Sequence, residues 1–164
     1  MDIVEVESTE LEECSDIVFE SEMGKRYYSS NKEVYRRLRA GMEEGDKIYT
    51  AKNHNGCMKG ILWYQQEGIF HAFPYLHMIV VRNSCQYQGI GKSLLDFFEY
   101  NTLVNGYNTL RTKVFLTVGD YNINAENIYK KRGYIQVGEI ADLYRKGTTE
   151  KLYMKIVTAS EFIS

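Results

Sequence analysis

The sequence predicts one α/β domain in which short strands alternate with helices in the order β-α-α-β-β-β-α-β-α-β-β. The chain has 164 residues, of which 44% are hydrophobic, so a substantial core can form without disulfides or metal ions. Stretches rich in β-branched and aromatic residues alternate with stretches whose apolar residues recur at helical spacing. No internal repeat and no flexible linker divides the chain, so residues 1–164 are expected to form a single domain.

The N-terminal part is predicted to contain a strand over residues 2–6 and two helices over residues 8–22 and 31–44. A serine and a threonine followed by glutamates are typical of a helix start, and they precede the first amphipathic stretch. Asn31 is expected to cap the second helix, and Gly45 is expected to end it. Two helices should therefore precede the central strands.

A hairpin is predicted next, because Asn55-Gly56 separates two strand-like stretches, residues 47–52 and 59–65. A loop over residues 68–73 then leads to a buried strand over residues 75–81. The elements expected after it are a helix over 91–105, a strand over 114–118, a helix over 124–132 and strands over 135–140 and 152–157.

Composition and charge exclude several classes of function. The chain has 20 Lys and Arg residues against 22 Asp and Glu, which provides no broad basic field, so nucleic acid is not expected as a partner. The apolar runs are far shorter than the ~20 residues that a bilayer requires and the N-terminus is acidic, so we expect no membrane span, no signal peptide and no membrane partner. Three scattered cysteines indicate neither a disulfide framework nor a zinc site, so a reducing, cytoplasmic location and no metal are expected.

The stretch Gln86-Tyr87-Gln88-Gly89-Ile90-Gly91-Lys92-Ser93 lies between a predicted buried strand and a predicted helix. Unpaired amides at a helix N-terminus favour an anion, and glycines allow the backbone to approach it closely. Gly-x-Gly before a helix also occurs in ordinary turns, so the spacing alone leaves both interpretations open. A nucleotide P-loop is disfavoured, because that motif requires a glycine where this chain has Gln86.

The pattern Gln-x-x-Gly-x-Gly after a hydrophobic strand resembles the acyl-CoA pyrophosphate loop of the GNAT superfamily of N-acetyltransferases. The segment from Asn122 to Tyr134 resembles the family's second motif, Asn-x-x-Ala-x-x-x-Tyr-x-x-x-Gly-aromatic. The resemblance implies a GNAT-type acyl-CoA N-acyltransferase fold, with a mixed, mostly antiparallel central sheet flanked by helices. It also implies acetyl-CoA as cosubstrate.

The resemblance further implies roles for individual residues. The pyrophosphate would lie on amides of Gln86 to Ser93, chiefly those from Tyr87 to Lys92. The family's main-chain contacts with the pantetheine arm fall on Ile79, Val80 and Val81. The Ile79 amide would face the thioester carbonyl oxygen, where a donor stabilises the transition state. Asn122 resembles the asparagine that binds the pantetheine region, and it can also cap the following helix.

Tyr129 occupies the position of the tyrosine that protonates the CoA thiolate in this family, and core packing is the alternative role for it. His77 is the candidate base, because it lies two residues before Ile79 and therefore shares a strand face with Ile79 and with Tyr75. Some arylalkylamine-type members of the family carry histidine there. A core histidine, or a base acting through water, remains an alternative.

Aromatic residues are concentrated where the acceptor walls are expected, and core packing is again the alternative. They are Tyr27, Tyr28, Trp63, Tyr64, Phe70 and Phe73. Such walls would favour an amine with an apolar or aromatic body over a polyamine.

The chain is thus predicted to be an acetyl-CoA-dependent N-acetyltransferase that acetylates a primary amine of a small molecule or of a peptide or protein end. The alternative is a catalytically silent acyl-CoA-binding or sensor domain of the same fold. The identity of the acceptor and a homodimeric state remain open.

Overall fold

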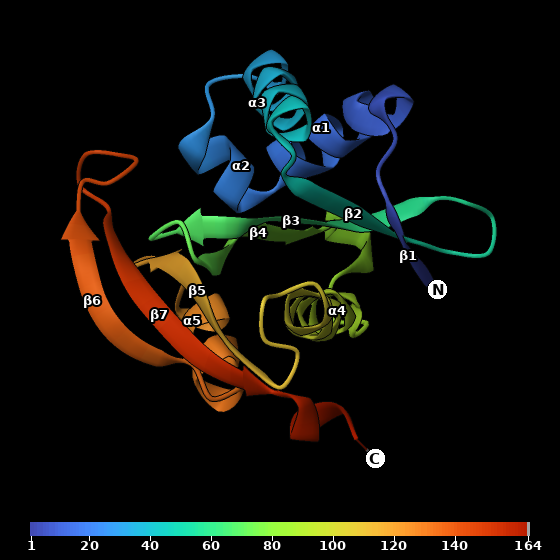
Figure 1. The fold of residues 1–164 in the computed structure, drawn as a ribbon. Helices are drawn as coiled ribbons and strands as arrows, with labels where there is room; N and C mark the ends of the chain where they lie inside the picture. The colour runs from blue at the N-terminus through green and yellow to red at the C-terminus, as the bar shows by residue number, and fades with distance from the viewer. Residues whose placement is uncertain (164) are drawn as a thin grey trace. The chain divides into compact units, whose positions relative to one another are not determined.

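A seven-stranded sheet and five helices make up most of the computed structural model, which describes residues 1–163 (Figure 1). The strands are β1 (Asp2–Glu5), β2 (Lys47–Lys52), β3 (Met58–Ile69), β4 (Phe73–Val81), β5 (Arg111–Gly119), β6 (Ile135–Ala141) and β7 (Thr149–Thr158). The helices are α1 (Leu11–Glu20), α2 (Glu22–Tyr27), α3 (Asn31–Glu44), α4 (Ile90–Val104) and α5 (Ile123–Lys131).

The strand order across the sheet is β1-β2-β3-β4-β5-β7-β6. β4 and β5 pair in parallel, whereas β1 with β2, β2 with β3, β5 with β7 and β6 with β7 pair antiparallel. The sheet is therefore mixed and mostly antiparallel, and the predicted fold class is confirmed.

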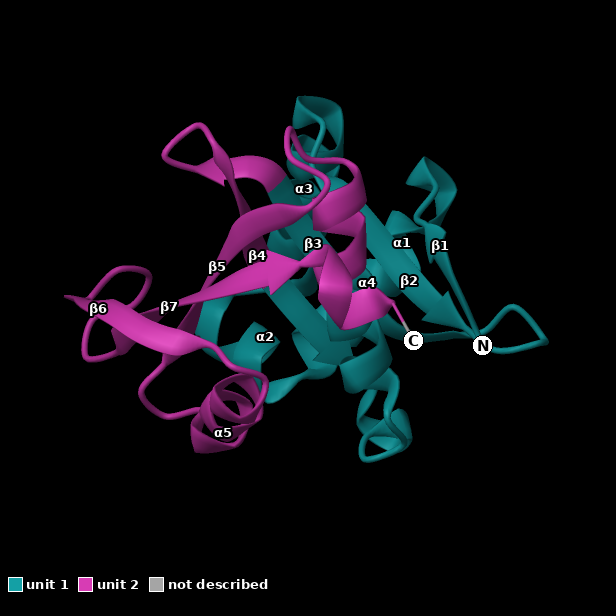
Figure 2. Cartoon of the chain, turned by 60° about the horizontal axis from the view of Figure 1, so that its bottom comes forward, with its two compact units in different colours: residues 1–65, 78–98 teal, residues 66–77, 99–164 magenta. Residues whose placement is uncertain are grey.

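Two compact units divide the chain, and each contains two separate segments of it (Figure 2). Unit 1 consists of Met1–Gln65 and Met78–Phe98, and unit 2 consists of Gln66–His77 and Glu99–Ser164. β3, β4 and α4 each contribute residues to both units.

The core of unit 1 lies between its helices and its strands. α1 packs against α3, and apolar residues at helical spacing on each helix are buried, among them Ile17 and Leu38. Ser30 caps the start of α3, because its hydroxyl accepts from the Glu33 amide at 3.2 Å. The prediction that Asn31 caps this helix is therefore wrong by one residue. The predicted end is confirmed, because Gly45 has φ +91°.

The helix predicted over residues 8–22 is divided at Ser21. The Ser21 hydroxyl donates to the Val18 carbonyl at 2.6 Å and accepts from the Gly24 amide at 2.9 Å, so it ends α1 and caps α2. A Cβ on Gly24 would lie 1.8 Å from the Val18 carbonyl oxygen, so only glycine allows this approach. Three helices therefore precede β2, not the two predicted.

Unit 2 has α5 on one face of its strands. Glu126 of α5 accepts from Lys151 at 3.0 Å and from the Tyr153 hydroxyl at 2.5 Å, so these alternate residues of β7 point toward the helix. Glu99 of α4 accepts from Lys155 at 2.8 Å on the same face. The opposite face of β7 consequently carries the residues between them.

The connection from β3 to β4 is a tight turn rather than the predicted loop over residues 68–73. Phe70 and His71 form it with φ +54° and +50°, and the Ala72 amide donates to the Ile69 carbonyl at 3.2 Å. Asn-Gly is the usual sequence of a turn with two positive φ angles, so Phe-His gives no signal of one. The Phe70 side chain is 71% exposed, and its ring centre lies 5.9 Å from that of Phe115 in an edge-to-face arrangement.

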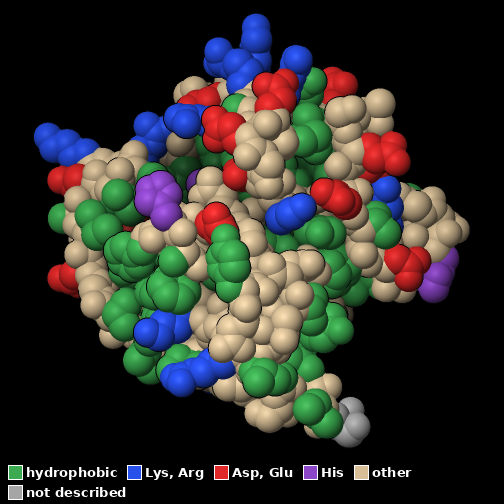
Figure 3. Space-filling view, in the orientation of Figure 1, with side chains coloured by type: hydrophobic (Ala, Val, Ile, Leu, Met, Phe, Trp, Pro, Cys, Tyr) green, Lys and Arg blue, Asp and Glu red, His purple; other side chains and the backbone are tan. Residues whose placement is uncertain are grey.

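Two regions of the surface differ in the side chains that they carry (Figure 3). Lys and Arg side chains cluster over α3, where Arg36, Arg37 and Arg39 are exposed. Apolar side chains reach the surface along β6, including Ile135 and Ile140. Among residues 1–163, no helix is both long and apolar enough to cross a bilayer. In the same range, no three His, Cys, Asp or Glu side chains are grouped as metal ligands would be.

Candidate active site

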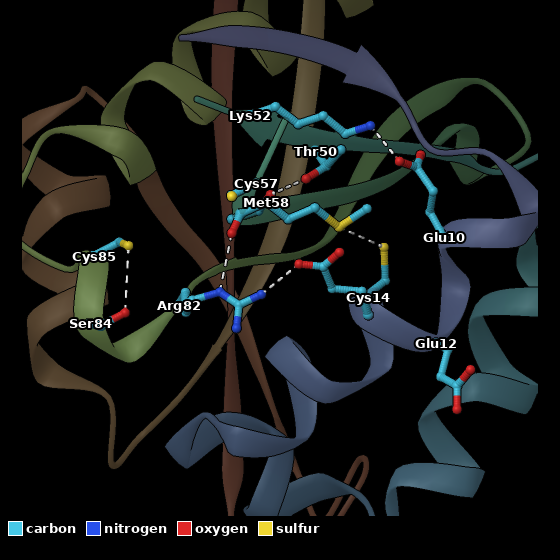
Figure 4. Close-up of polar contacts among 12 residues, drawn as sticks. Glu10, Glu12, Cys14, Thr50, Lys52, Cys57, Met58, Arg82, Ser84 and Cys85 are labelled. Atoms are coloured by element: carbon cyan, nitrogen blue, oxygen red, sulfur yellow. Dashed lines mark hydrogen bonds and ion pairs between the residues drawn. The ribbon is translucent and has the colours of Figure 1, made fainter. Parts of the chain in front are cut away.

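The segment between β4 and α4 begins at Arg82, which ties the end of β4 to its neighbours in unit 1 (Figure 4). The Arg82 Nε donates to the Met58 carbonyl at 3.1 Å, and its Nη2 lies 2.8 Å from Glu13 Oε1. The Arg82 amide donates to the Lys59 carbonyl at 2.9 Å, and the Cys85 amide donates back to the Arg82 carbonyl at 2.8 Å. These contacts hold the entrance to the predicted phosphate loop on β3 and α1.

The four loop residues before α4, Gln86 to Gly89, are exposed to solvent. Tyr87 is 97% exposed and has φ +62°, and Gly89 has φ +82°. The amide of Ser93 donates to the Gly89 carbonyl at 3.0 Å, and helix geometry leaves the amides that precede it without an intrahelical acceptor. The loop therefore presents a short run of donors at the positive end of a helix dipole.

β4 has two faces of different character. Leu76, Met78 and Val80 are buried, whereas the residues that alternate with them are only partly buried. His77 and Ile79 belong to this partly buried face, as the spacing predicted. The structure thus places His77 outside the fully buried core.

Tyr75 precedes His77 on the same face, and their rings lie 6.4 Å apart in an edge-to-face arrangement. The Tyr75 hydroxyl is 2.9 Å from Thr117 Oγ1 on β5 and 3.0 Å from the Tyr144 hydroxyl in the connection from β6 to β7. Burial is the largest cause that raises the pKa of Tyr75 well above its usual value. Tyr75 is therefore a neutral hydroxyl at physiological pH, beside the imidazole of His77.

The pairing of β4 with β5 is short. It joins Tyr75 to Phe115 and Leu76 to Leu116, although both strands continue beyond these pairs. The pairing of β4 with β5 therefore ends at Leu76, immediately before His77. Main-chain groups of a strand that has lost its neighbour can bond to an extended ligand.

α5 carries the two residues singled out in the second motif. The Asn122 side chain accepts from the Ala125 amide at 3.2 Å, so Asn122 caps the helix. The Tyr129 ring lies 5.5 Å from the Tyr134 ring, and burial raises the pKa of Tyr129 to about 12. Tyr129 therefore keeps its proton well into the alkaline range.

The aromatic residues predicted to form the acceptor walls differ in burial and in position. Trp63 and Tyr64 are core residues at 5% and 0% exposure, and the Tyr64 ring packs 5.1 Å from Phe98. Phe70 and Phe73 instead lie 5.9 and 5.8 Å from Phe115 in unit 2. Tyr27 and Tyr28, at the end of α2 in unit 1, are half-buried. The six aromatic residues thus include both core and exposed side chains, and they belong to both units.

Sequence reasoning missed three polar residues in unit 2, namely Thr117, Tyr144 and Glu150. Thr117 and Glu150 lie on different strands, and only the pairing of β5 with β7 places them on a common face with Tyr75. Tyr144 is in an irregular connection that has no motif. The alternation of residues along one strand indicates which of them share a face of that strand. It does not indicate which residues of a neighbouring strand lie opposite them.

Comparisons with known proteins agree with this geometry. A family model described as an acetyltransferase (GNAT) domain matches residues 13–150. The ribosomal-protein-S18-alanine N-acetyltransferase from Escherichia coli superposes with a TM-score of 0.76 at 17% identity, over 96% of this chain and 94% of that chain. A mutant of the spermidine N-acetyltransferase SpeG from Vibrio cholerae superposes with a TM-score of 0.73 at 13% identity, over 94% and 92% of the two chains.

An acetyltransferase of the GNAT family from Bacillus cereus gives a TM-score of 0.70 at 17% identity, over 94% of this chain and 95% of that chain. A search of curated protein sequences finds no match. At these identities the solved structures establish the fold, while the family model spans most of the sequence. The chain belongs to the GNAT family of N-acetyltransferases, which use acetyl-CoA and amine acceptors.

Proposed function

We propose that this chain transfers an acetyl group from acetyl-CoA to a primary amine of a small molecule, or of a peptide or protein end, by direct attack of the amine on the thioester. The single observation that carries the proposal is the exposed loop before α4, in which Gly89 has φ +82° and which leads into helix amides that have no intrahelical acceptor. The family supplies the reaction class, and the loop supports a role for this chain's own residues in it.

The loop residues fit a pyrophosphate in three respects. Gln86, Tyr87, Gln88 and Gly89 are exposed, so a ligand can reach them. The amides of Ile90, Gly91 and Lys92 lie in the first turn of a helix of 15 residues. A Cβ on Gly91 would contact only Val81, at 3.5 Å, so internal packing does not require a glycine there. Close approach of a ligand explains that glycine.

The proposed reaction forms a bond between the amine nitrogen and the acetyl carbon and breaks the bond between that carbon and sulfur. His77 accepts the proton that the amine loses, directly or through water. Tyr129 donates a proton to the departing thiolate, and its raised pKa keeps that proton available at neutral pH. The amide of Ile79 donates to the carbonyl oxygen as charge develops on it, while main chain from Ile79 to Val81 holds the pantetheine arm together with Asn122.

Calorimetry with acetyl-CoA tests the loop. Gly89→Glu places a carboxylate where the phosphates are proposed to lie and should abolish binding. Gly56→Glu is the matched control, because Gly56 also has positive φ, at +78°, and a Cβ there would also meet nothing within 4 Å. Unchanged affinity in a folded Gly89→Glu variant would contradict the site. Equal loss in both variants would point to a general effect of strain and charge.

A second measurement separates catalysis from silent binding. Release of free thiol from acetyl-CoA is followed against a library of primary amines and short peptides. Transfer requires thiol release that depends on the amine and an acetylated product detected by mass spectrometry. Tight binding of acetyl-CoA without thiol release across the library would instead favour the silent binding domain.

A further inference from the structure

Strand register gathers a set of polar and aromatic residues on one face of unit 2. Residues directly opposite each other in paired strands share a face, and Tyr75 is opposite Phe115 on β5. Thr117 is opposite Leu152, and Gly119 is opposite Glu150. Alternation along each strand therefore places Tyr75 and His77 of β4, Phe115 and Thr117 of β5, and Glu150 and Leu152 of β7 on the same face, away from α5.

The Glu150 carboxylate gives this face a negative end. Glu150 is 2% exposed, so its charge acts through protein rather than through water and is only weakly screened. Its field contributes to the raised pKa of Tyr75, after burial and the Tyr144 hydroxyl, whereas the hydrogen bond with Thr117 lowers that pKa. Tyr75 and Tyr144 thus have hydroxyl oxygens 3.0 Å apart within the field of a buried anion.

The other end of the face is aromatic and basic. Phe73 follows the same alternation on β4 and lies 5.8 Å from Phe115. Lys113 has its ammonium 5.9 Å from the centre of the Phe73 ring. A ligand with one ammonium and an apolar body fits a face that is negative at Glu150 and basic at Lys113. A second ammonium directed toward Lys113 would be repelled.

We infer that this face receives the acceptor, that the acceptor is a primary monoamine with an aromatic body, and that Tyr144 and Glu150 are its specificity-determining residues. The ammonium donates to the hydroxyl oxygens of Tyr75 and Tyr144 in the field of Glu150, while Tyr75 donates its own proton to Thr117. The ring packs toward Phe115. This inference rests on the proposed transfer and names the substrate class and two residues for it.

Thiol release with 2-phenylethylamine, spermidine and a peptide that begins with alanine tests the inference. The value of kcat/KM should be at least about tenfold higher for 2-phenylethylamine than for the other two. Glu150→Gln and Tyr144→Phe should each raise the KM for 2-phenylethylamine about tenfold, as expected when the field of a buried charge or one charge-assisted hydrogen bond is lost. Both variants should leave kcat and the KM for acetyl-CoA within about twofold.

Two matched variants control for charge and for the tyrosine hydroxyl. Glu139→Gln removes an exposed carboxylate from β6, opposite Lys151 and hence on the other face. Tyr107→Phe removes a hydroxyl that bonds to Glu67 in the same unit. Neither should change any constant. Should Glu150→Gln fail to fold, Tyr144→Phe still decides the matter, because it removes one oxygen from a side chain that is 47% exposed.

The inference is overturned if spermidine or the peptide is the better acceptor, if the KM for 2-phenylethylamine is unchanged in Tyr144→Phe, or if the controls shift it equally. Failure of the proposed function has a different signature. When another amine of the library releases thiol and 2-phenylethylamine does not, acetyl transfer stands and only the acceptor class is wrong. When no amine releases thiol, both fail.

Discussion

Replacing Glu126 by glutamine should destabilise unit 2 and remove a part of its pH dependence. Glu126 is 6% exposed, and its carboxylate lies 3.0 Å from Lys130, 3.0 Å from Lys151 and 2.5 Å from the Tyr153 hydroxyl. These hydrogen bonds lower the pKa of Glu126 from 4.5 to about 2. They attach α5, and with it Tyr129, to β7.

The magnitude follows from linkage. The difference between 4.5 and about 2 corresponds to roughly 3.4 kcal/mol at 1.36 kcal/mol per pH unit. The lysine side chains are 55% and 27% exposed, and solvent screening reduces the expected value to about 2 kcal/mol. The pKa is lowered in the folded state, so this stability is fully present above pH 4.5 and is lost as pH falls through about 2. At pH 3 roughly half or less remains.

Thermal unfolding of both proteins at pH 7 and at pH 3 tests this. Glu126→Gln should lower Tm by about 4–8 °C at pH 7, and the gap should shrink by about half at pH 3. Glu43→Gln is the control, because its ion pair with Arg39 is exposed on both sides and should contribute little. A Glu126→Gln variant that melts with the parent at pH 7, or a gap that does not depend on pH, would refute the reasoning.

Three further outcomes are expected. Tyr129→Phe should lower kcat by ~10²-fold or more with little change in acetyl-CoA affinity; equal turnover from neutral to alkaline pH would make Tyr129 a packing residue. His77→Gln should lower kcat by ~10²-fold or more and flatten the acidic limb of the rate profile, without changing the calorimetric affinity for acetyl-CoA; a variant that retains activity and the same limb would leave proton transfer to solvent. His71→Gly should stabilise the protein by about 0.5–1 kcal/mol in urea unfolding, because glycine accepts the φ of +50° without strain; loss of stability would show that the histidine side chain contributes more than its strained backbone costs.

Local chemistry explains why most elements could be predicted. Gly45 and Asn55-Gly56 occur where the backbone tolerates only a few residue types. Gly45 therefore predicted the end of a helix, and Asn55-Gly56 predicted a hairpin. The break at Ser21 could not be predicted in this way, because it depends on how closely Gly24 approaches Val18. Likewise the Phe70 turn, which joins the neighbouring strands β3 and β4, has none of the residues typical of such turns, so no local signal marks it.

The same difference between local and long-range information applies to the candidate site. The loop from Gln86 to Ser93 and the helix with Tyr129 are contiguous in sequence, so their motifs could be recognised without a structure. The face that includes Thr117 and Glu150 depends on pairing between residues that are more than 30 positions apart in the sequence. No alternation within one strand contains that information. Motifs therefore indicated the cosubstrate, and only the register indicated how an acceptor could be selected.

The interleaving of the two units has a consequence for truncation and for synthesis on the ribosome. Every residue of unit 1 has been made once Phe98 is added, whereas unit 2 needs residues that lie on both sides of that point. A fragment ending at Phe98 would retain Gln66–His77 without β5, which pairs with this segment, and would leave the partly buried Phe73 and Tyr75 uncovered. Such a fragment should aggregate rather than behave as a soluble half, and a nascent chain passes through the same state before β5 is complete. Deletion series intended to isolate one unit should therefore remove the β3–β4 hairpin tip together with the C-terminal segment.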